Sequence, residues 1–217
     1  VIRSHAPDEN NPSICKLRAN GNELVYLNPR EYNSYGEADA KQHFPDCLFI
    51  PEGGLSKEGI KGAMEIVSDC LPHAPTHIIL AGGSMGTASG ILAAAPAHIK
   101  VVIVPAWKGC TDSYIYEILG KYDVTPQCSW ELWPDYHFGG FGKFNRSLID
   151  FMTTFSLNHS VPLDPVYTGK LMYAIEDKRS AGFFKEEDAI VAIHTGGLQG
   201  LEGYRYRFPE EWGCYVP

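Results

Sequence analysis

Long hydrophobic runs and basic residues are both scarce in this sequence of 217 residues. No apolar run approaches the roughly 18–20 residues needed to span a bilayer, and we recognise no secretory signal. Eighteen Lys and Arg residues stand against 26 Asp and Glu, a formal net charge of −8, and an acidic chain has little general affinity for nucleic acid or anionic lipid. These absences argue against a nucleic-acid or membrane partner and predict a cytoplasmic protein.

Cysteine is present but lacks any paired spacing. The six cysteines form no C-x-x-C pair: Cys15, Cys47, Cys70, Cys110, Cys128 and Cys214. Such a scatter suits neither a zinc site nor a small disulfide scaffold, and no cluster of His, Cys and Asp has ligand spacing. We therefore expect no metal site.

The rest of the composition is that of an ordinary globular protein, 44% hydrophobic and 20% charged. A chain of this length can bury roughly 70% of its unfolded surface, enough for a sizeable core. It begins Val1-Ile2-Arg3, without an initiator Met, which we interpret as a fragment or a mature piece of a longer chain. The length predicts one large domain, or one domain with part of another.

Alternating apolar runs and helical patterns predict the fold class. From residue 47 onward they indicate an α/β fold with an open, mostly parallel sheet flanked by helices. The expected strands are residues 47–50, 77–81, 100–104 and 189–193. The expected helices are residues 57–71, 87–95, 112–119, 145–157 and 169–175. The preceding stretch is polar and turn-rich, with a helix expected at residues 13–19 and a strand at residues 24–27.

A glycine-rich segment, residues 83–87, lies between an expected strand and an expected helix. Its glycines let the chain turn sharply and expose N–H groups, and the helix that follows offers its positive end, so a phosphate fits there. It is not a Walker loop, because no Gly-Lys-Ser/Thr follows, and it does not fit G-x-G-x-x-G. The alternative is a turn that needs glycine for close packing.

Three more segments are candidates for a site at the carboxyl edge of the sheet, where α/β proteins bind ligands. Residues 194–197 (His-Thr-Gly-Gly) follow the last expected strand, and Tyr167 and Thr168 are expected at a helix N-terminus. The aromatic and glycine-rich residues 136–143 are suited to covering a planar ligand. For each segment, a simple turn or a packing role is the alternative, and His194 alone is more often structural.

The order of these motifs resembles one family. The series is Pro-Glu-Gly-Gly at 51–54, Gly-Ser-Met-Gly-Thr at 83–87, Tyr-His-Phe-Gly-Gly at 136–140, Leu-Asp-Pro-Val-Tyr-Thr-Gly-Lys at 163–170 and His-Thr-Gly-Gly at 194–197. It resembles the 1-aminocyclopropane-1-carboxylate deaminase / D-cysteine desulfhydrase family of pyridoxal-phosphate enzymes, which have the tryptophan-synthase-β-like fold. The resemblance covers essentially the whole chain. It implies that residues 1–44 are a remnant of a smaller N-terminal α/β domain and that residues 45–217 form the larger, pyridoxal-phosphate-binding domain.

The resemblance also implies pyridoxal 5′-phosphate as the cofactor, an amino acid as the substrate, and a homodimer. The implied cofactor contacts are Gly83, Ser84, Met85, Gly86 and Thr87 around the phosphate, Thr168 at the pyridine nitrogen, and Thr195. Tyr167 is the implied catalytic residue, and with Phe141 it lines the implied substrate pocket.

Thr168 and Thr195 favour one branch of the family. In the deaminases the residue that matches Thr168 is Glu, which keeps the pyridine nitrogen protonated and strengthens the ring as an electron sink. A Thr hydroxyl cannot supply that charge, and the deaminases carry Leu where this sequence has Thr195. The pair therefore resembles D-cysteine desulfhydrase, which performs a β-elimination that releases pyruvate, ammonia and sulfide.

The sequence departs from the family in two places. The Schiff-base lysine of the family lies in a Ser-Gly-Asn-Lys-type segment that this sequence lacks, and Phe141 stands where these enzymes usually have Tyr. We therefore expect this chain alone to be catalytically inactive. The alternatives are a 1-aminocyclopropane-1-carboxylate deaminase, a non-catalytic binder of pyridoxal phosphate or phosphate, and a weaker reading as a nucleotide-binding oxidoreductase.

Overall fold

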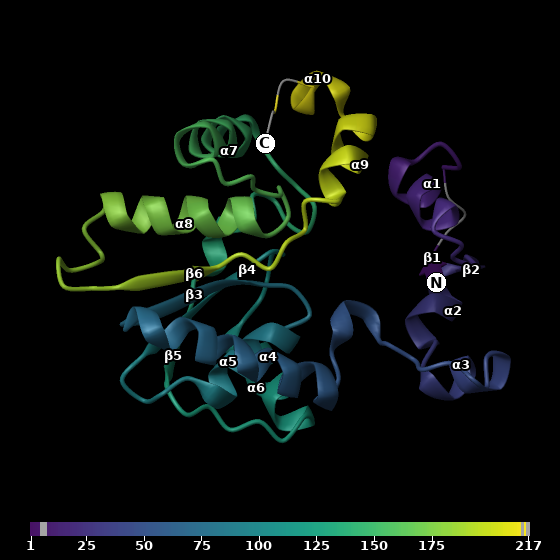
Figure 1. The fold of residues 1–217 in the computed structure, drawn as a ribbon, viewed down its shortest axis with the longest axis horizontal. Coiled ribbons are helices and arrows are strands. Elements are labelled where there is room, and N and C mark those ends of the chain that lie inside the picture. Colours follow the sequence, from purple (N-terminus) through teal and green to yellow (C-terminus); the bar gives the residue numbers. More distant parts are fainter. Residues whose placement is uncertain (5–7, 214, 216–217) are drawn as a thin grey trace. The chain divides into compact units, whose positions relative to one another are not determined.

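Four parallel strands form the larger sheet of the structure, a computed structural model that describes residues 1–4, 8–213 and 215 (Figure 1). The sheet order is β5-β4-β3-β6. The strands are β3 (His77–Gly82), β4 (Lys100–Pro105), β5 (Ser129–Leu132) and β6 (Ile190–Ile193). Their parallel register confirms the predicted α/β fold with a parallel sheet.

Helices cover both faces of this sheet, as Figure 1 shows. One face carries α4 (Lys57–Cys70), α5 (Gly86–Ala94) and α6 (Asp112–Lys121). The other carries α7 (Arg146–His159) and α8 (Thr168–Ser180). Short 3₁₀ helices lie at Glu52–Gly54, Leu71–His73 and Pro134–His137. In the described part of the chain, no helix is long and apolar enough to cross a membrane.

The central strands alternate their side chains between two cores. Ile78 and Leu80 of β3 are fully buried in the cluster that includes α4, α5 and α6. Ile79, between them, belongs to a second cluster with Val102 of β4 and Leu171 of α8. Both faces of the strand are thus covered, which explains the continuous apolar run in the sequence.

The helices begin where the sequence supplies a capping side chain. Ser56 accepts a hydrogen bond from the backbone of the first turn of α4, Thr111 does so for α6 and Asn145 for α7. Each bond satisfies one N–H group that the helix cannot satisfy itself. The expected helices at 57–71, 112–119 and 145–157 are therefore confirmed, with bounds that differ by a few residues.

The expected strand at residues 47–50 is wrong. The structure has no regular element there, and the side chains of Leu48 and Ile50 are 87% and 72% exposed. The run is short and is bounded by Pro45 and Pro51, and an apolar run becomes a strand only where a neighbouring strand can pair with it. Strand β5, a short edge strand of mixed polarity, was not foreseen.

The described residues divide into two units by their contacts. The terminal unit comprises the described residues of Val1–Pro51 and Gln199–Cys214, and the sheet unit comprises those of Glu52–Leu198 and Tyr215–Pro217. This division differs from the boundary expected after residue 44. It also takes Gln199–Cys214 away from the larger part, because helix α9 in this segment packs on α1.

The terminal unit contains a two-stranded parallel sheet and several short helices. Strand β1 (Ile2–Ser4) pairs with β2 (Val25–Leu27). The helices are α1 (Pro12–Ala19), α2 (Pro29–Ser34), α3 (Glu37–His43), α9 (Gly200–Arg207) and α10 (Pro209–Trp212). The helix expected at 13–19 and the strand at 24–27 are confirmed, whereas α2, α3, α9 and α10 were not foreseen.

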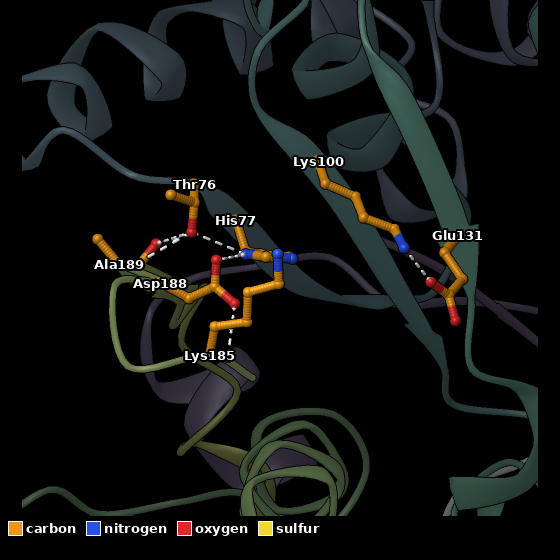
Figure 2. Close-up of polar contacts among 7 residues, drawn as sticks. All are labelled: Thr76, His77, Lys100, Glu131, Lys185, Asp188 and Ala189. Atoms are coloured by element: carbon orange, nitrogen blue, oxygen red, sulfur yellow. Dashed lines mark hydrogen bonds and ion pairs between the residues drawn. The ribbon is translucent and has the colours of Figure 1, made fainter. Parts of the chain in front are cut away.

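Polar side chains gather where β3, β4 and β6 begin, at the edge opposite their carboxyl ends (Figure 2). Thr76 Oγ1 forms a 2.8 Å hydrogen bond with His77 Nδ1 and accepts one from Ala189 N. Asp188 Oδ1 lies 3.8 Å from His77 Nδ1, and nearby Lys100 pairs with Glu131. These contacts connect the start of the edge strand β6 to the start of β3.

Candidate functional site

A cavity of about 160 Å³ lies at the carboxyl ends of β3 and β6 in the sheet unit. Its lining consists of Gly53, residues 81–88, Tyr167 and Thr195. The structure therefore brings together, around one cavity, three segments that the sequence analysis selected separately. This is the edge of a parallel sheet at which ligands bind in α/β proteins.

The glycine-rich loop leads directly into helix α5. Met85, the residue before the helix, has a left-handed backbone with φ of +69°, and its side chain is buried in the core. A Cβ on Gly82, the last residue of β3, would lie 2.7 Å from the Met85 methyl carbon and 2.9 Å from Ile103 Cγ2, so a side chain there would force these neighbours to shift. The first N–H groups of α5 have no partner within the helix. The helix dipole gives this end of the helix a partial positive charge, which attracts an anion.

A second loop closes against the first. Ser84 Oγ donates a 3.2 Å hydrogen bond to the carbonyl oxygen of Gly53. Gly53 has φ of +66°, and a Cβ there would lie 2.5 Å from Ser84 Oγ. Only a glycine permits this approach, so the Pro-Glu-Gly-Gly segment has a geometric reason for its composition.

The ring of Tyr167 lies next to Gly83 in the lining of the cavity. A Cβ built on Gly83 would lie 3.0 Å from Tyr167 Cε1 and 3.3 Å from its hydroxyl oxygen. Burial raises the pKa of the Tyr167 phenol, and the nearby carboxylates of Asp164 and Glu52 raise it further. The group is therefore a neutral phenol at ordinary pH, able to donate a hydrogen bond or a proton.

Asp164, which was named in the sequence only as part of the motif at residues 163–170, organises the start of α8. Its side chain is 1% exposed. Oδ1 accepts hydrogen bonds from the backbone N–H groups of Val166 and Tyr167, both at 2.8 Å. Oδ2 accepts from Thr168 N at 2.9 Å and from Thr168 Oγ1 at 2.6 Å. An Asp that precedes a helix is the signal that could have revealed this capping role.

Thr168 is buried behind the cavity and does not line it. Its hydroxyl donates to Asp164 Oδ2 and accepts a 2.7 Å hydrogen bond from Asp164 N. The Thr168 hydroxyl therefore both donates and accepts a hydrogen bond within the chain. The contact between Thr168 and a pyridine nitrogen stays a prediction.

The segment after β6 supplies the remaining wall. Thr195 lines the cavity, and Gly197, with φ of +92°, packs on Asp164: a Cβ there would lie 2.9 Å from the carboxyl carbon. His194 Nε2 is 2.9 Å from the carbonyl oxygen of Pro162, and its Nδ1 accepts a hydrogen bond from Gly196 N. Both ring nitrogens of His194 thus have backbone partners, the arrangement of a structural histidine.

Phe141 lies in the aromatic and glycine-rich loop and is 60% exposed. Its ring centroid is 6.0 Å from that of Tyr167, and the rings are inclined by 70°. Phe141 does not line the cavity itself. It extends the aromatic surface that Tyr167 begins.

Lys170, seen in the sequence only as the end of a motif, is a buried charge with three partners. Its side chain is 1% exposed, and Nζ donates hydrogen bonds of 2.9 Å each to the carbonyl oxygens of Ala106, His137 and Gly140. Burial lowers the pKa of the ammonium group to about 8, against the opposing charge of Asp164. The group is therefore protonated at pH 7 and donates all three hydrogens.

The residues around the cavity fit the phosphate of pyridoxal 5′-phosphate. Close-packed glycines, a hydroxyl at Ser84, a helix N-terminus and an aromatic ring surround a space of the size of a phosphate with part of a ring.

Among the described residues, no group of three or more His, Cys, Asp or Glu side chains is placed to hold a metal ion.

Comparison with known proteins supports the resemblance found in the sequence. No family model matches the chain. The D-cysteine desulfhydrases of Salmonella paratyphi C, Salmonella choleraesuis and Salmonella typhi are each 31% identical to it over 170 residues. The match covers 71% of this chain and 52% of each relative, so the chain spans about half the length of the curated relatives it matches.

Two solved structures share the fold. A crystal structure described as an ACC deaminase homologue aligns with a TM-score of 0.77 at 24% identity, covering 95% of this chain and 68% of the other. The structure of O-ureido-L-serine synthase aligns with a TM-score of 0.56 at 16% identity, covering 99% of this chain and 68% of the other. Over the part that it spans, the chain therefore belongs to the D-cysteine desulfhydrase and 1-aminocyclopropane-1-carboxylate deaminase family, with the tryptophan-synthase-β-like fold of these pyridoxal-phosphate enzymes.

Proposed function

We propose that this chain holds pyridoxal 5′-phosphate as part of a D-cysteine desulfhydrase-type lyase. The observation that carries the proposal is the cavity at the carboxyl ends of β3 and β6, where residues 83–87, Tyr167 and Thr195 converge. The names of the sequence relatives support the choice of desulfhydrase. The substrate class that follows is a D-amino acid with a thiol leaving group.

Each group at the cavity has a task in this proposal. The loop of residues 83–87 and the first turn of α5 hold the phosphate, and Ser84 adds a hydroxyl. Bound there, pyridoxal phosphate supplies the electron sink that makes the α-proton of an amino acid acidic. The neutral phenol of Tyr167, beside Gly83, donates a hydrogen bond or a proton to the reacting group.

Thr168 supports the desulfhydrase over the deaminase. Its hydroxyl donates to the Asp164 carboxylate and carries no charge of its own. A β-elimination expels the thiolate once the α-proton is removed, and it therefore needs less help from a protonated ring nitrogen than the deaminase reaction does. Substitution of Glu at this position would bring a second carboxylate against the buried Asp164, which the site does not accommodate as it stands.

The proposal assigns to this chain the phosphate site and the aromatic walls, and not the base that removes the α-proton. No segment of the sequence matches the Ser-Gly-Asn-Lys motif of the family. We therefore propose that the chain alone forms no covalent adduct and is inactive. The homodimer stays a prediction from the resemblance, which sedimentation can check.

The first prediction places a negative charge in the phosphate site by the substitution Ser84→Asp. The carboxylate would repel a phosphate and occupy its space, so we expect the affinity for pyridoxine 5′-phosphate, measured by calorimetry, to fall at least about tenfold, or 1.4 kcal/mol. The matched control is Ser113→Asp, the same change at an exposed serine in the first turn of α6, and it should leave the affinity unchanged.

Two results would contradict the proposal. Equal affinity of Ser84→Asp and the unchanged protein would show that the phosphate binds elsewhere. A stoichiometric adduct after treatment with equimolar pyridoxal phosphate and borohydride, seen as a gain over the intact mass of 24.0 kDa, would show that a lysine of this chain forms the covalent bond.

A further inference from the structure

Lys170 is a buried charge near the cavity, 1% exposed like Asp164, and it does not line the cavity itself. It lies in the first turn of α8, three residues after Tyr167, and its Nζ does not line the cavity. All three of its hydrogens go to backbone carbonyl oxygens. Such a group is a cation held by the chain rather than a nucleophile in reach of a ligand.

The three carbonyl oxygens belong to two different parts of the sheet unit. Ala106 follows β4, and its N–H donates a 2.9 Å hydrogen bond to the carbonyl oxygen of Gly82 in β3. His137 and Gly140 belong to the aromatic and glycine-rich loop. Lys170 thus connects this loop with the strand end beside the glycine-rich segment.

The backbone of this loop turns sharply, and Gly139 N donates a 2.9 Å hydrogen bond to His137 Nδ1 within it. Phe138 has φ of +51°, and Gly139, Gly140 and Gly142 also have positive φ. Within the loop, Gly140 N donates to the His137 carbonyl and Lys143 N to the Gly140 carbonyl. The two carbonyls that close these turns are the same two that Lys170 binds, so the ammonium group fixes the turn at both ends.

We propose that Lys170 is a positioning residue that pins the loop of residues 137–143 to the end of β4, and thereby holds Phe141 as the wall next to Tyr167. This inference rests on the proposed function, because it assumes that the ligand extends from the phosphate site to these two rings. According to this inference, Lys170 contributes to the affinity for the ring part of the ligand and does not contribute to the affinity for its phosphate.

The test compares Lys170→Met with the matched control Lys61→Met, an exposed lysine on α4. Hydrogen exchange should show protection of residues 138–143 reduced at least about fivefold in Lys170→Met, with β3 and the second half of α8 unchanged. Affinity for pyridoxine 5′-phosphate should fall about fivefold, while affinity for inorganic phosphate stays the same. Lys61→Met should change none of these quantities.

The unchanged protein supplies a test that does not depend on the variant folding. A neutral amine has two hydrogens, so one of the three carbonyl oxygens loses its partner when Lys170 is deprotonated. The carboxylate of Asp164 supplies the charge that acts on the ammonium, and burial places the pKa of Lys170 at about 8. Protection of residues 138–143, corrected for intrinsic exchange, should therefore fall between pH 7.5 and 9.5, and it should not do so in Lys170→Met.

Several outcomes would overturn the inference: unchanged loop protection in Lys170→Met, a uniform loss across the sheet unit, or no pH effect in the unchanged protein. Loss of loop protection with full affinity for pyridoxine 5′-phosphate would show that the loop is not a wall of the site. If the unchanged protein binds neither ligand, the proposed function fails, while the exchange data still decide whether Lys170 holds the loop.

Discussion

Asp164 is the residue on which two separate segments of the site depend. Its carboxylate accepts hydrogen bonds from the first turn of α8, which carries Tyr167. It also lies against Gly197, in the segment after β6 that contributes Thr195. A change that displaces this carboxylate should therefore disturb both walls of the cavity at once.

The substitution Gly197→Ala tests this arrangement, with Gly196→Ala as its matched control. Both glycines have nearly the same φ, +92° and +95°, so alanine should strain the backbone similarly at each. A Cβ at 197 would lie 2.9 Å from the Asp164 carboxyl carbon, whereas a Cβ at 196 meets nothing within 4 Å. We expect Gly197→Ala to reduce the free energy of unfolding by about 2 kcal/mol more than Gly196→Ala, as measured by urea denaturation. Equal losses would show that the Asp164 contact is unimportant.

At the scale of residues, the sequence revealed the residues that line the cavity better than the residues that hold this lining in place. Residues 83–87, Tyr167 and Thr195 were selected from motifs, and the structure places them around one cavity. Asp164 and Lys170 were not selected, because their roles depend on backbone groups. The carbonyl partners of Lys170 lie 64, 33 and 30 residues away, which no local pattern reveals.

At the scale of elements, the edge strand β6 depends on the polar cluster at its start. Thr76 exchanges hydrogen bonds with the backbone of Ala189, and His77 pairs with Thr76 (Figure 2). Burial lowers the pKa of His77, with a smaller opposing effect from Asp188. The histidine is therefore held neutral in the folded protein at a pH where an unfolded chain would protonate it.

This cluster predicts a pH dependence of stability. Since His77 has a lower pKa folded than unfolded, the unfolded chain binds more protons as the pH falls below about 6.5, and the contribution present above that pH is lost. In His77→Phe, which keeps an aromatic ring next to Phe184, the difference in free energy of unfolding between pH 7.5 and 5.5 should be smaller than in the unchanged protein. Urea denaturation at the two pH values measures it, and an equal or larger difference in the variant would refute the assignment.

The sheet shows which elements a sequence can predict. Strands β3 and β4 were foreseen because both of their faces are buried, so every position after their first residues, His77 and Lys100, is apolar. Residues 47–50 have the same apolar character but no strand to pair with, and the prediction there was wrong. Strand β5 was missed because it is short, lies at an edge and alternates polar and apolar residues.

At the scale of the molecule, residues 47–50, of which Leu48 and Ile50 are largely exposed, immediately precede the boundary between the terminal unit and the sheet unit in the sequence. They combine large apolar side chains with an absence of regular structure, so thermolysin, which cleaves before such residues, should cut first at Leu48 or Ile50. Leu157 is an internal control, since it is 70% exposed but lies within helix α7. Mass spectrometry of the first fragments identifies the site that is cut first. Cleavage before Leu157 ahead of cleavage at residues 47–50 would contradict the expectation that residues 47–50 are less stably structured than helix α7.

The terminal unit is assembled from two segments of the chain, and in the sequence all four strands of the larger sheet come between these segments. During translation, helix α1 emerges long before α9, against which it packs. The sheet unit has most of its residues by then and can fold before α9 is available to α1. Ribosome stalling near residue 198 would therefore release a chain that has the cavity residues but lacks α9, the helix on which α1 packs, and such a chain is a natural client for chaperones.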